Sequence, residues 1–117
     1  MAKLSSFLKK LTRAEMADRN GYNKSLFDTE EGTCYLCKAV GDTARHEIYP
    51  ASNRSYSKAL GMWINVCPCC HSKIHLNPLD FNPLKEEGQR IFEREYGHER
   101  FVAVFSRNYL DEEEWIE

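Results

Sequence analysis

Cysteine and histidine side chains are concentrated in the middle of the sequence, at spacings that are typical of metal sites. Two Cys-x-x-Cys pairs with 29 residues between them supply four thiols, Cys34, Cys37, Cys67 and Cys70. Two such pairs commonly bind one zinc ion tetrahedrally. We therefore interpret the four thiols as ligands of a structural zinc. Cys69 would point away from its neighbours, so we assign it to packing, with replacement of Cys70 as the alternative.

Three histidines near the second cysteine pair could hold a second metal ion. His71 and His75 are four residues apart, which places both imidazoles on one face of a helix. The pair follows Cys70 directly, so a structural zinc would anchor the first turn of the helix that carries it. His46 lies on a predicted strand, and a hairpin leading into the helix would bring it opposite the pair. His98 lies in a charged helical stretch, and we assign it to the surface.

Hydrophobic periodicity, together with the positions of glycine and proline, predicts the elements that carry these residues. A polar connection to Thr33 follows the first of them, with Leu26 and Phe27 as its packing point, and Pro68 suits the first turn of a helix. The last helix would bury Phe101, Val102, Val104 and Phe105. In order, the predicted elements are a helix over 5–19, a strand over 45–49, a helix over 53–60, a strand over 62–66, and helices over 68–75, 84–96 and 99–110.

Size and composition predict one domain in a reducing compartment. A chain of 117 residues buries a modest core, which a structural metal would supplement. No apolar run approaches the roughly 20 residues of a membrane span, so we expect no membrane anchor. Lys9, Lys10 and Arg13 interrupt the one stretch that could resemble a secretory signal. We therefore expect a cytoplasmic protein, where paired cysteines bind metal more often than they form disulfides.

Charge is distributed unevenly along the chain. The formal net charge is -2, but residues 1–27 are basic and most of the acidic residues lie near the other end, including the closing run Asp111 to Glu114. A basic arm and an acidic tail are compatible with DNA binding. The alternative is that both are solvated helix faces.

Residues 34–75 resemble the HNH endonuclease family, and most closely its small phage-type members. The resemblance rests on the run His46-Glu47-Ile48-Tyr49-Pro50, then Asn53-Arg54, and then Cys67-Pro68-Cys69-Cys70-His71 with His75. It implies a ββα-metal finger in an α+β fold, with the structural zinc inside the finger and helices flanking it on both sides. A phage origin would place the protein in the host cell cytoplasm.

The resemblance also implies roles for individual residues. His71 and His75 correspond to ligands of a catalytic divalent ion, which could be Mg²⁺, Mn²⁺ or another metal, and we count His71 among the catalytic residues. The family's first strand carries a metal ligand and then a general base, three residues before a proline. Counting back from Pro50 puts His46 at the metal position and Glu47 at the base position. In the alternative, His46 is the base and Glu47 assists with the metal.

One position departs from the family pattern. The family's middle asparagine normally lies nine residues before the first helix histidine, and Met62 stands there. Asn53 or Asn65 could brace the loop instead. Arg54 has forked donors that suit a phosphate, although a solvent-exposed helix start is an equal alternative, and Lys73 is our second candidate for nucleic-acid binding.

Together these patterns predict a single domain with a basic helical arm (1–30), an HNH core (31–80) and C-terminal helices with an acidic tail (81–117). The predicted function is metal-dependent hydrolysis of DNA by nicking of one strand, with contacts mainly to the phosphate backbone and with phage proteins as further partners. The first alternative is a zinc-stabilised module that binds DNA or protein without cutting. The second is a small protein–protein adaptor.

Overall fold

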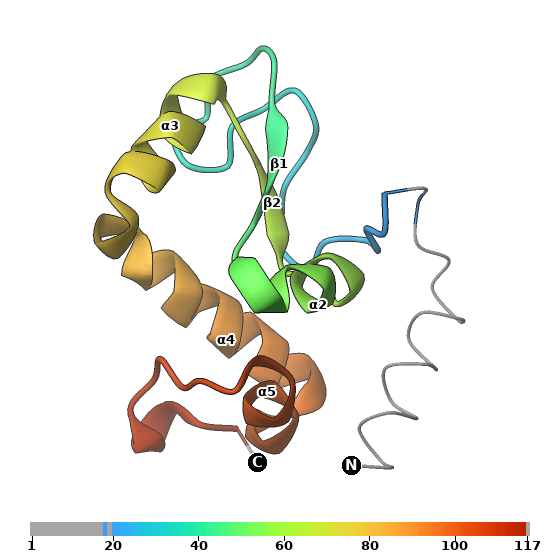
Figure 1. Ribbon diagram of the computed structural model, residues 1–117, viewed down its shortest axis with the longest axis vertical. Helices are drawn as coiled ribbons and strands as arrows, with labels where there is room; N and C mark the ends of the chain where they lie inside the picture. The colour runs from blue at the N-terminus through green and yellow to red at the C-terminus, as the bar shows by residue number, and fades with distance from the viewer. Residues whose placement is uncertain (1–17, 19, 117) are drawn as a thin grey trace.

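The computed structural model describes Asp18 and residues 20–116, and Figure 1 shows how its elements are arranged. The helix predicted over 5–19 lies outside the described residues, apart from Asp18. In chain order, the elements are β1 (Ala44–Glu47), the 3-10 helix η1 (Ala51–Asn53), α2 (Arg54–Ala59), β2 (Trp63–Val66), α3 (Pro68–Leu76), η2 (Pro78–Phe81), α4 (Asn82–Tyr96), α5 (His98–Phe105) and η3 (Glu112–Glu114).

A two-stranded antiparallel hairpin, β1 and β2, forms the centre of the molecule. The register pairs His46 with Ile64 and Glu47 with Trp63. Because side chains alternate along a strand, His46 and Ile64 share one face of the hairpin, while Glu47 and Trp63 share the other together with Arg45. The hairpin therefore separates the two candidate catalytic side chains, although they are neighbours in sequence.

A short helical segment connects the two strands. The helix predicted over 53–60 is the continuous pair η1 and α2, which ends at Ala59. Gly61 follows with a φ of 74°, a conformation that favours glycine. A Cβ there would lie 2.5 Å from the backbone oxygen of Lys24, so this position requires glycine on both counts.

Helix α3 begins where the sequence predicts. Pro68 occupies its first turn, and the Cys67 side chain caps it by accepting the Cys70 amide proton. Cys70 and Ile74 are buried on one side of the helix. After Asn77 the chain enters η2 and then α4, which in Figure 1 runs diagonally from the end of α3 and passes beneath the hairpin.

The C-terminal helices pack on the end of the hairpin through aromatic side chains. The ring of Tyr49 contacts Phe101, with ring centroids 5.5 Å apart, and Phe105, with centroids 4.5 Å apart. Phe92 of α4 contacts the same two phenylalanines. Phe101, Val104 and Phe105 are buried as predicted.

The last helix is shorter than predicted, and one of its predicted core residues is wrong. Helix α5 ends at Phe105 rather than Leu110, because Ser106 adopts a left-handed conformation with a φ of 57°. Val102 is 37% exposed instead of buried.

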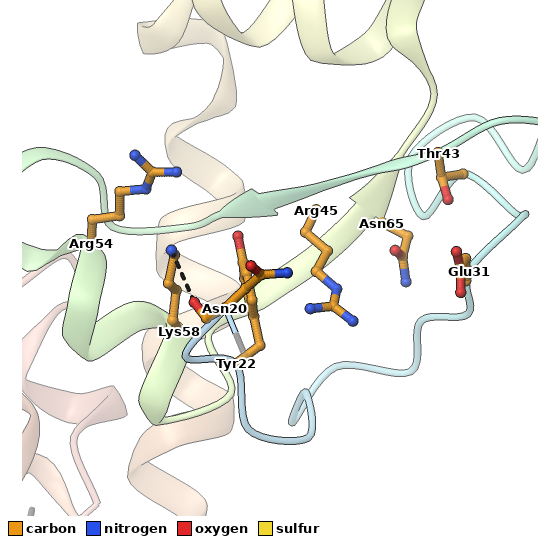
Figure 2. Close-up of a pocket in the computed structure, with 8 residues that line it drawn as sticks. All are labelled: Asn20, Tyr22, Glu31, Thr43, Arg45, Arg54, Lys58 and Asn65. Atoms are coloured by element: carbon orange, nitrogen blue, oxygen red, sulfur yellow. Dashed lines mark hydrogen bonds between the residues drawn. The ribbon is translucent and has the colours of Figure 1, made fainter. Parts of the chain in front are cut away.

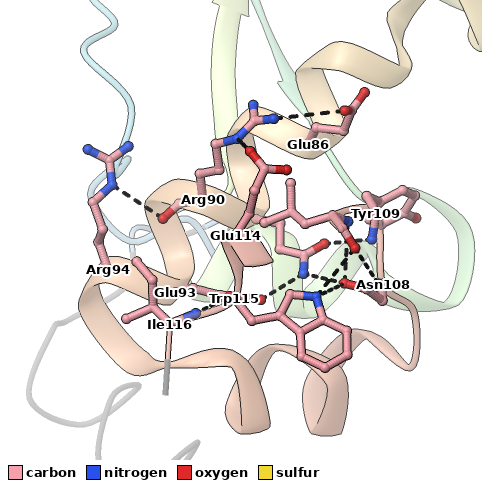
Figure 3. Close-up of polar contacts among 11 residues, drawn as sticks. Glu86, Arg90, Glu93, Arg94, Asn108, Tyr109, Glu114, Trp115 and Ile116 are labelled. Atoms are coloured by element: carbon pink, nitrogen blue, oxygen red, sulfur yellow. Dashed lines mark hydrogen bonds and ion pairs between the residues drawn. The ribbon is translucent and has the colours of Figure 1, made fainter. Parts of the chain in front are cut away.

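The prediction that His98 lies on the surface is also wrong, because its side chain is only 13% exposed. Its Nδ1 lies 2.7 Å from a carboxylate oxygen of the buried Glu93, and its ring stacks on Trp115 with centroids 3.8 Å apart. The acidic tail, residues 111–116, returns over α4 and is fastened there by the polar contacts drawn in Figure 3. We call this segment the C-terminal strap.

The described residues form a small α+β unit in which a hairpin is followed by helices, in agreement with the predicted fold class at that level. None of the helices in the described part of the chain combines the length and apolarity that a membrane span requires.

Candidate metal centre

Four cysteine thiols meet where the first turn of α3 faces the loop before β1. The sulfur atoms of Cys34, Cys37, Cys67 and Cys70 all lie within 4.8 Å of one another. Each pair has the same local geometry: the Cys37 amide lies 3.5 Å from the Cys34 sulfur, and the Cys70 amide lies 3.4 Å from the Cys67 sulfur. Amide protons directed at the first sulfur of a pair stabilise thiolates. The sequence prediction of a four-cysteine cluster is thus confirmed.

Local backbone bonds shape the first knuckle. The Cys34 amide donates to Ala39, and the Lys38 amide donates back to Cys34. Lys38 has a φ of 67°, which lets the chain reverse within a few residues. The Tyr35 amide donates to the Asn65 carbonyl of β2, so the knuckle is tied directly to the hairpin.

The electrostatics of the cluster suit a cation. Burial opposes ionisation of Cys34, but hydrogen bonds from backbone amides outweigh it and bring the pKa of Cys34 down to about 6. Burial raises the pKa of Cys70 to about 12, and hydrogen bonds with the neighbouring thiols, Cys67 first, add to the effect. The first thiolate therefore forms readily, while further ones need a positive charge among them. A zinc ion supplies that charge, so the residues fit a structural zinc.

Cys69 does not belong to this cluster. Its side chain is exposed, so both the packing role assigned to it and the alternative that it replaces Cys70 are wrong. The helical turn after Pro68 directs Cys70 toward the other thiols and Cys69 toward solvent.

The three histidines come together on the side of the hairpin that faces α3. His46 of β1 and His71 and His75 of α3 each offer a ring nitrogen, and the three nitrogens lie within 4.8 Å of one another. The Nε2 atoms of His71 and His75 are 3.1 Å apart. Two nitrogens bound to one metal at about 2.1 Å each are roughly 3 Å apart, so this pair is already at the spacing of shared ligands.

Burial keeps two of these imidazoles neutral. Burial lowers the pKa of His46 to about 4, and the neighbouring His71 adds to the effect. Burial also lowers the pKa of His71, and the nearby His75 adds to this effect. A neutral imidazole is the form that binds a cation, so the arrangement can hold a divalent metal.

Glu47 lies apart from this cluster. Its side chain is 10% exposed and accepts a hydrogen bond from Arg54 Nε at 2.5 Å, on the opposite face of the hairpin from His46. Burial raises the pKa of Tyr22, and the negative charge of the Glu47 carboxylate adds to this effect. The Tyr22 hydroxyl therefore lies close to Glu47. Period-two alternation along β1 could have predicted this separation from the sequence.

The other predicted site residues are placed as follows. Lys73 is exposed on α3, and Arg54 is exposed at the start of α2. Met62, at the position where the family has asparagine, is fully buried. Asn53 donates to the Phe105 carbonyl, and the Asn65 side chain to the Thr29 hydroxyl, so neither side chain is bonded to the histidine cluster.

A polar pocket on the Glu47 face of the hairpin was not predicted. Figure 2 shows Arg45 of β1 and Lys58 of α2 pointing into it with Arg54 and Tyr22. Two signals in the sequence could have indicated it: Arg45 lies two residues before Glu47 on a strand, and Lys58 lies four residues after Arg54 on a helix.

No family model matches the chain, and comparison with curated proteins and with solved structures gave no significant match. Its function must therefore be argued from its own residues.

Proposed function

We propose that the protein is a metal-dependent DNA endonuclease of the HNH type with a structural zinc. One observation carries the proposal: His46, His71 and His75 gather their ring nitrogens within 4.8 Å on a hairpin and a helix whose first turn also carries two of four clustered thiols. A rigid helix that begins at a structural metal is a suitable mount for catalytic ligands, because it fixes their positions in advance.

The chain's own groups have separate tasks in this proposal. His46, His71 and His75 hold the divalent ion, which when bound stabilises charge on the phosphate and on the leaving oxygen. His46 shares the cluster with the two helix histidines, which favours it as a ligand. A general base must lie within hydrogen-bond reach of the water it activates, and Glu47, paired with Arg54 on the opposite face of the hairpin, would take that role only through bridging waters.

Arg54 and Lys73 are the candidate contacts to DNA. Both side chains are exposed, and they belong to the two helices that flank the hairpin. Such contacts would give an affinity that falls with salt and depends little on sequence.

Nicking of supercoiled plasmid in Mg²⁺ or Mn²⁺ tests the proposal. We expect the parent protein to nick, and His75→Ala to lose more than 90% of this activity while keeping its zinc and its melting temperature. Ser72→Ala, an exposed change on the same helix, is the control and should nick like the parent. A parent protein with no activity in any divalent metal, or full activity in His75→Ala, would refute the proposal.

The alternative is a zinc-stabilised module that binds DNA without cutting it. The observation that favours it is the pairing of Glu47 with Arg54, which occupies the candidate base with a structural partner. In that case the protein would shift DNA in a gel and leave the plasmid intact, and Glu47→Gln would not change the outcome.

A further inference from the structure

The polar pocket on the Glu47 face has an uneven distribution of charge. We call it the Arg54 pocket; its volume is about 450 Å³, within the usual range for ligand sites. Arg54 and Lys58 line the end formed by α2, Glu31 and Thr43 line the other end, and Arg45 lies between them, with Tyr22 between it and Lys58 (Figure 2). Two cations of one helix therefore lie at one end of the pocket, and a third cation of β1 lies farther along it.

Two of the three cations are paired with carboxylates. Glu47 binds Arg54, and Asp18 binds Arg45. Each ion pair uses only part of the five donors of a guanidinium, so the remaining donors stay available. The Arg54 side chain is 63% exposed, whereas that of Glu47 is 10% exposed, so these donors face solvent rather than protein.

Lys58 reinforces the same end. Its ammonium group donates to the Asn20 carbonyl at 3.3 Å and lies 4.9 Å from the centre of the Tyr22 ring. Neither contact supplies a full negative charge. An anion that enters next to Arg54 would therefore find one guanidinium and one ammonium group of α2, with Arg45 beyond the Tyr22 ring, and forked guanidinium donors match phosphate oxygens.

The pocket is also close to the histidine cluster along the chain. His46 and Glu47 are consecutive residues of β1, and among the described strands only β2 pairs with β1, so the second edge of β1 has no strand beside it. A nucleic-acid strand crossing that edge would meet the histidines on one face of the hairpin and the Arg54 pocket on the other.

We propose that the Arg54 pocket binds a backbone phosphate of the nucleic acid that flanks the phosphate at the histidine cluster. This inference rests on the proposed function, because it takes a nucleic acid as the substrate. It adds a second anchoring point, made by Arg54, Lys58 and Arg45, which would fix the direction in which the strand crosses the hairpin.

Salt-dependent binding of a 20-base-pair duplex tests the proposal. It is measured with the zinc-loaded protein and without added Mg²⁺ or Mn²⁺. Each phosphate contact contributes about 0.9 to the slope of log affinity against log salt. We expect the double variant Arg54→Gln/Lys58→Gln to reduce that slope by about 1 and to weaken binding several-fold at 50 mM salt, and Lys58→Gln alone to reduce the slope by less. Arg54→Lys keeps the charge beside Glu47 and should retain most of the slope. Arg94→Gln, an exposed arginine of α4, is the matched control and should bind like the parent.

The outcomes separate this inference from the proposed function. Unchanged slopes in the variants, with the parent nicking plasmid, would overturn the pocket and leave the nuclease. Reduced slopes with no nicking would support the pocket and overturn the nuclease. Inorganic phosphate provides the second arm: if it binds the parent protein at the Arg54 pocket, as judged by arginine Nε–H resonances, while the duplex does not, the pocket is a site for small anions and the inference is wrong.

Discussion

Glu93 fastens the C-terminal strap, and its replacement by glutamine is a sharp test of how this half of the molecule is held together. The side chain is 1% exposed. One carboxylate oxygen accepts a hydrogen bond from Gln89 at 2.7 Å and lies 2.7 Å from His98 Nδ1, while the other accepts the Ile116 amide proton at 3.0 Å. Glutamine preserves the volume and changes only the hydrogen-bonding pattern.

The expected loss follows from counting donors. A glutamine at this position has one acceptor oxygen and an amide group that donates. If its oxygen serves Gln89 and His98, its NH₂ group faces the Ile116 N–H, which leaves two donors opposed in a partly buried position at a cost of about 1–3 kcal/mol. The two bonds that remain weaken, because an amide accepts less strongly than a carboxylate, at a cost of about 1 kcal/mol. We expect a total loss of about 2–4 kcal/mol in the free energy of unfolding.

Thermal denaturation and digestion from the C-terminus measure the effect. For a chain of roughly this length 1 kcal/mol corresponds to about 4 °C or more, so the melting temperature of Glu93→Gln should fall by about 8–16 °C. Carboxypeptidase should also remove the strap faster than in the parent. Glu95→Gln, an exposed change on the same helix, is the control and should shift the melting temperature by less than about 2 °C. A change of under about 3 °C with unchanged digestion in Glu93→Gln would refute the reasoning.

Two other sets of variants test the zinc and the packing. Cys37→Ser should lose the bound zinc on metal analysis, while Cys69→Ser keeps one equivalent; tight zinc in Cys37→Ser would contradict the four-thiol site. Gly88→Ala would put a Cβ 2.7 Å from the Tyr49 hydroxyl, and we expect a net loss of about 1–2 kcal/mol after a gain in helix propensity. In Gly61→Ala the added Cβ would lie 2.5 Å from the Lys24 backbone oxygen, and residue 61 has a positive φ. This change should therefore lower the melting temperature further than Gly88→Ala, and the reverse order would contradict the packing argument.

The features predicted correctly from the sequence are those that local residues determine. Pro68 and the cysteine pair around it mark the start of α3, and spacing alone places His71 and His75 on one face of that helix. The four-thiol cluster follows from a pattern that has few other uses. In each case the signal lies within a few residues of the feature it predicts.

The features that were missed depend on segments that are distant in sequence or on side chains that end an element. His98 is largely covered because the strap returns over it and stacks Trp115 on its ring, which the charged residues around it do not indicate. Helix α5 ends early because Ser106 turns left-handed and the Asn108 side chain bonds the backbone at Leu110, although the apolar pattern continues. The role of Arg54 beside Glu47 required knowing where α2 packs against β1.

The two cysteine pairs also have a consequence for the unfolded chain. When one ion joins them, residues 34–70 become a closed loop that contains both strands and α2. Closing a loop of this length removes conformational entropy that a disulfide treatment places at about 4 kcal/mol. Helices α4 and α5 lie outside the loop but share one core with it through Tyr49, so they are stabilised by its closure only through this packing. The metal would therefore act directly as a topological constraint on the half that carries the histidines, and only indirectly on the C-terminal helices.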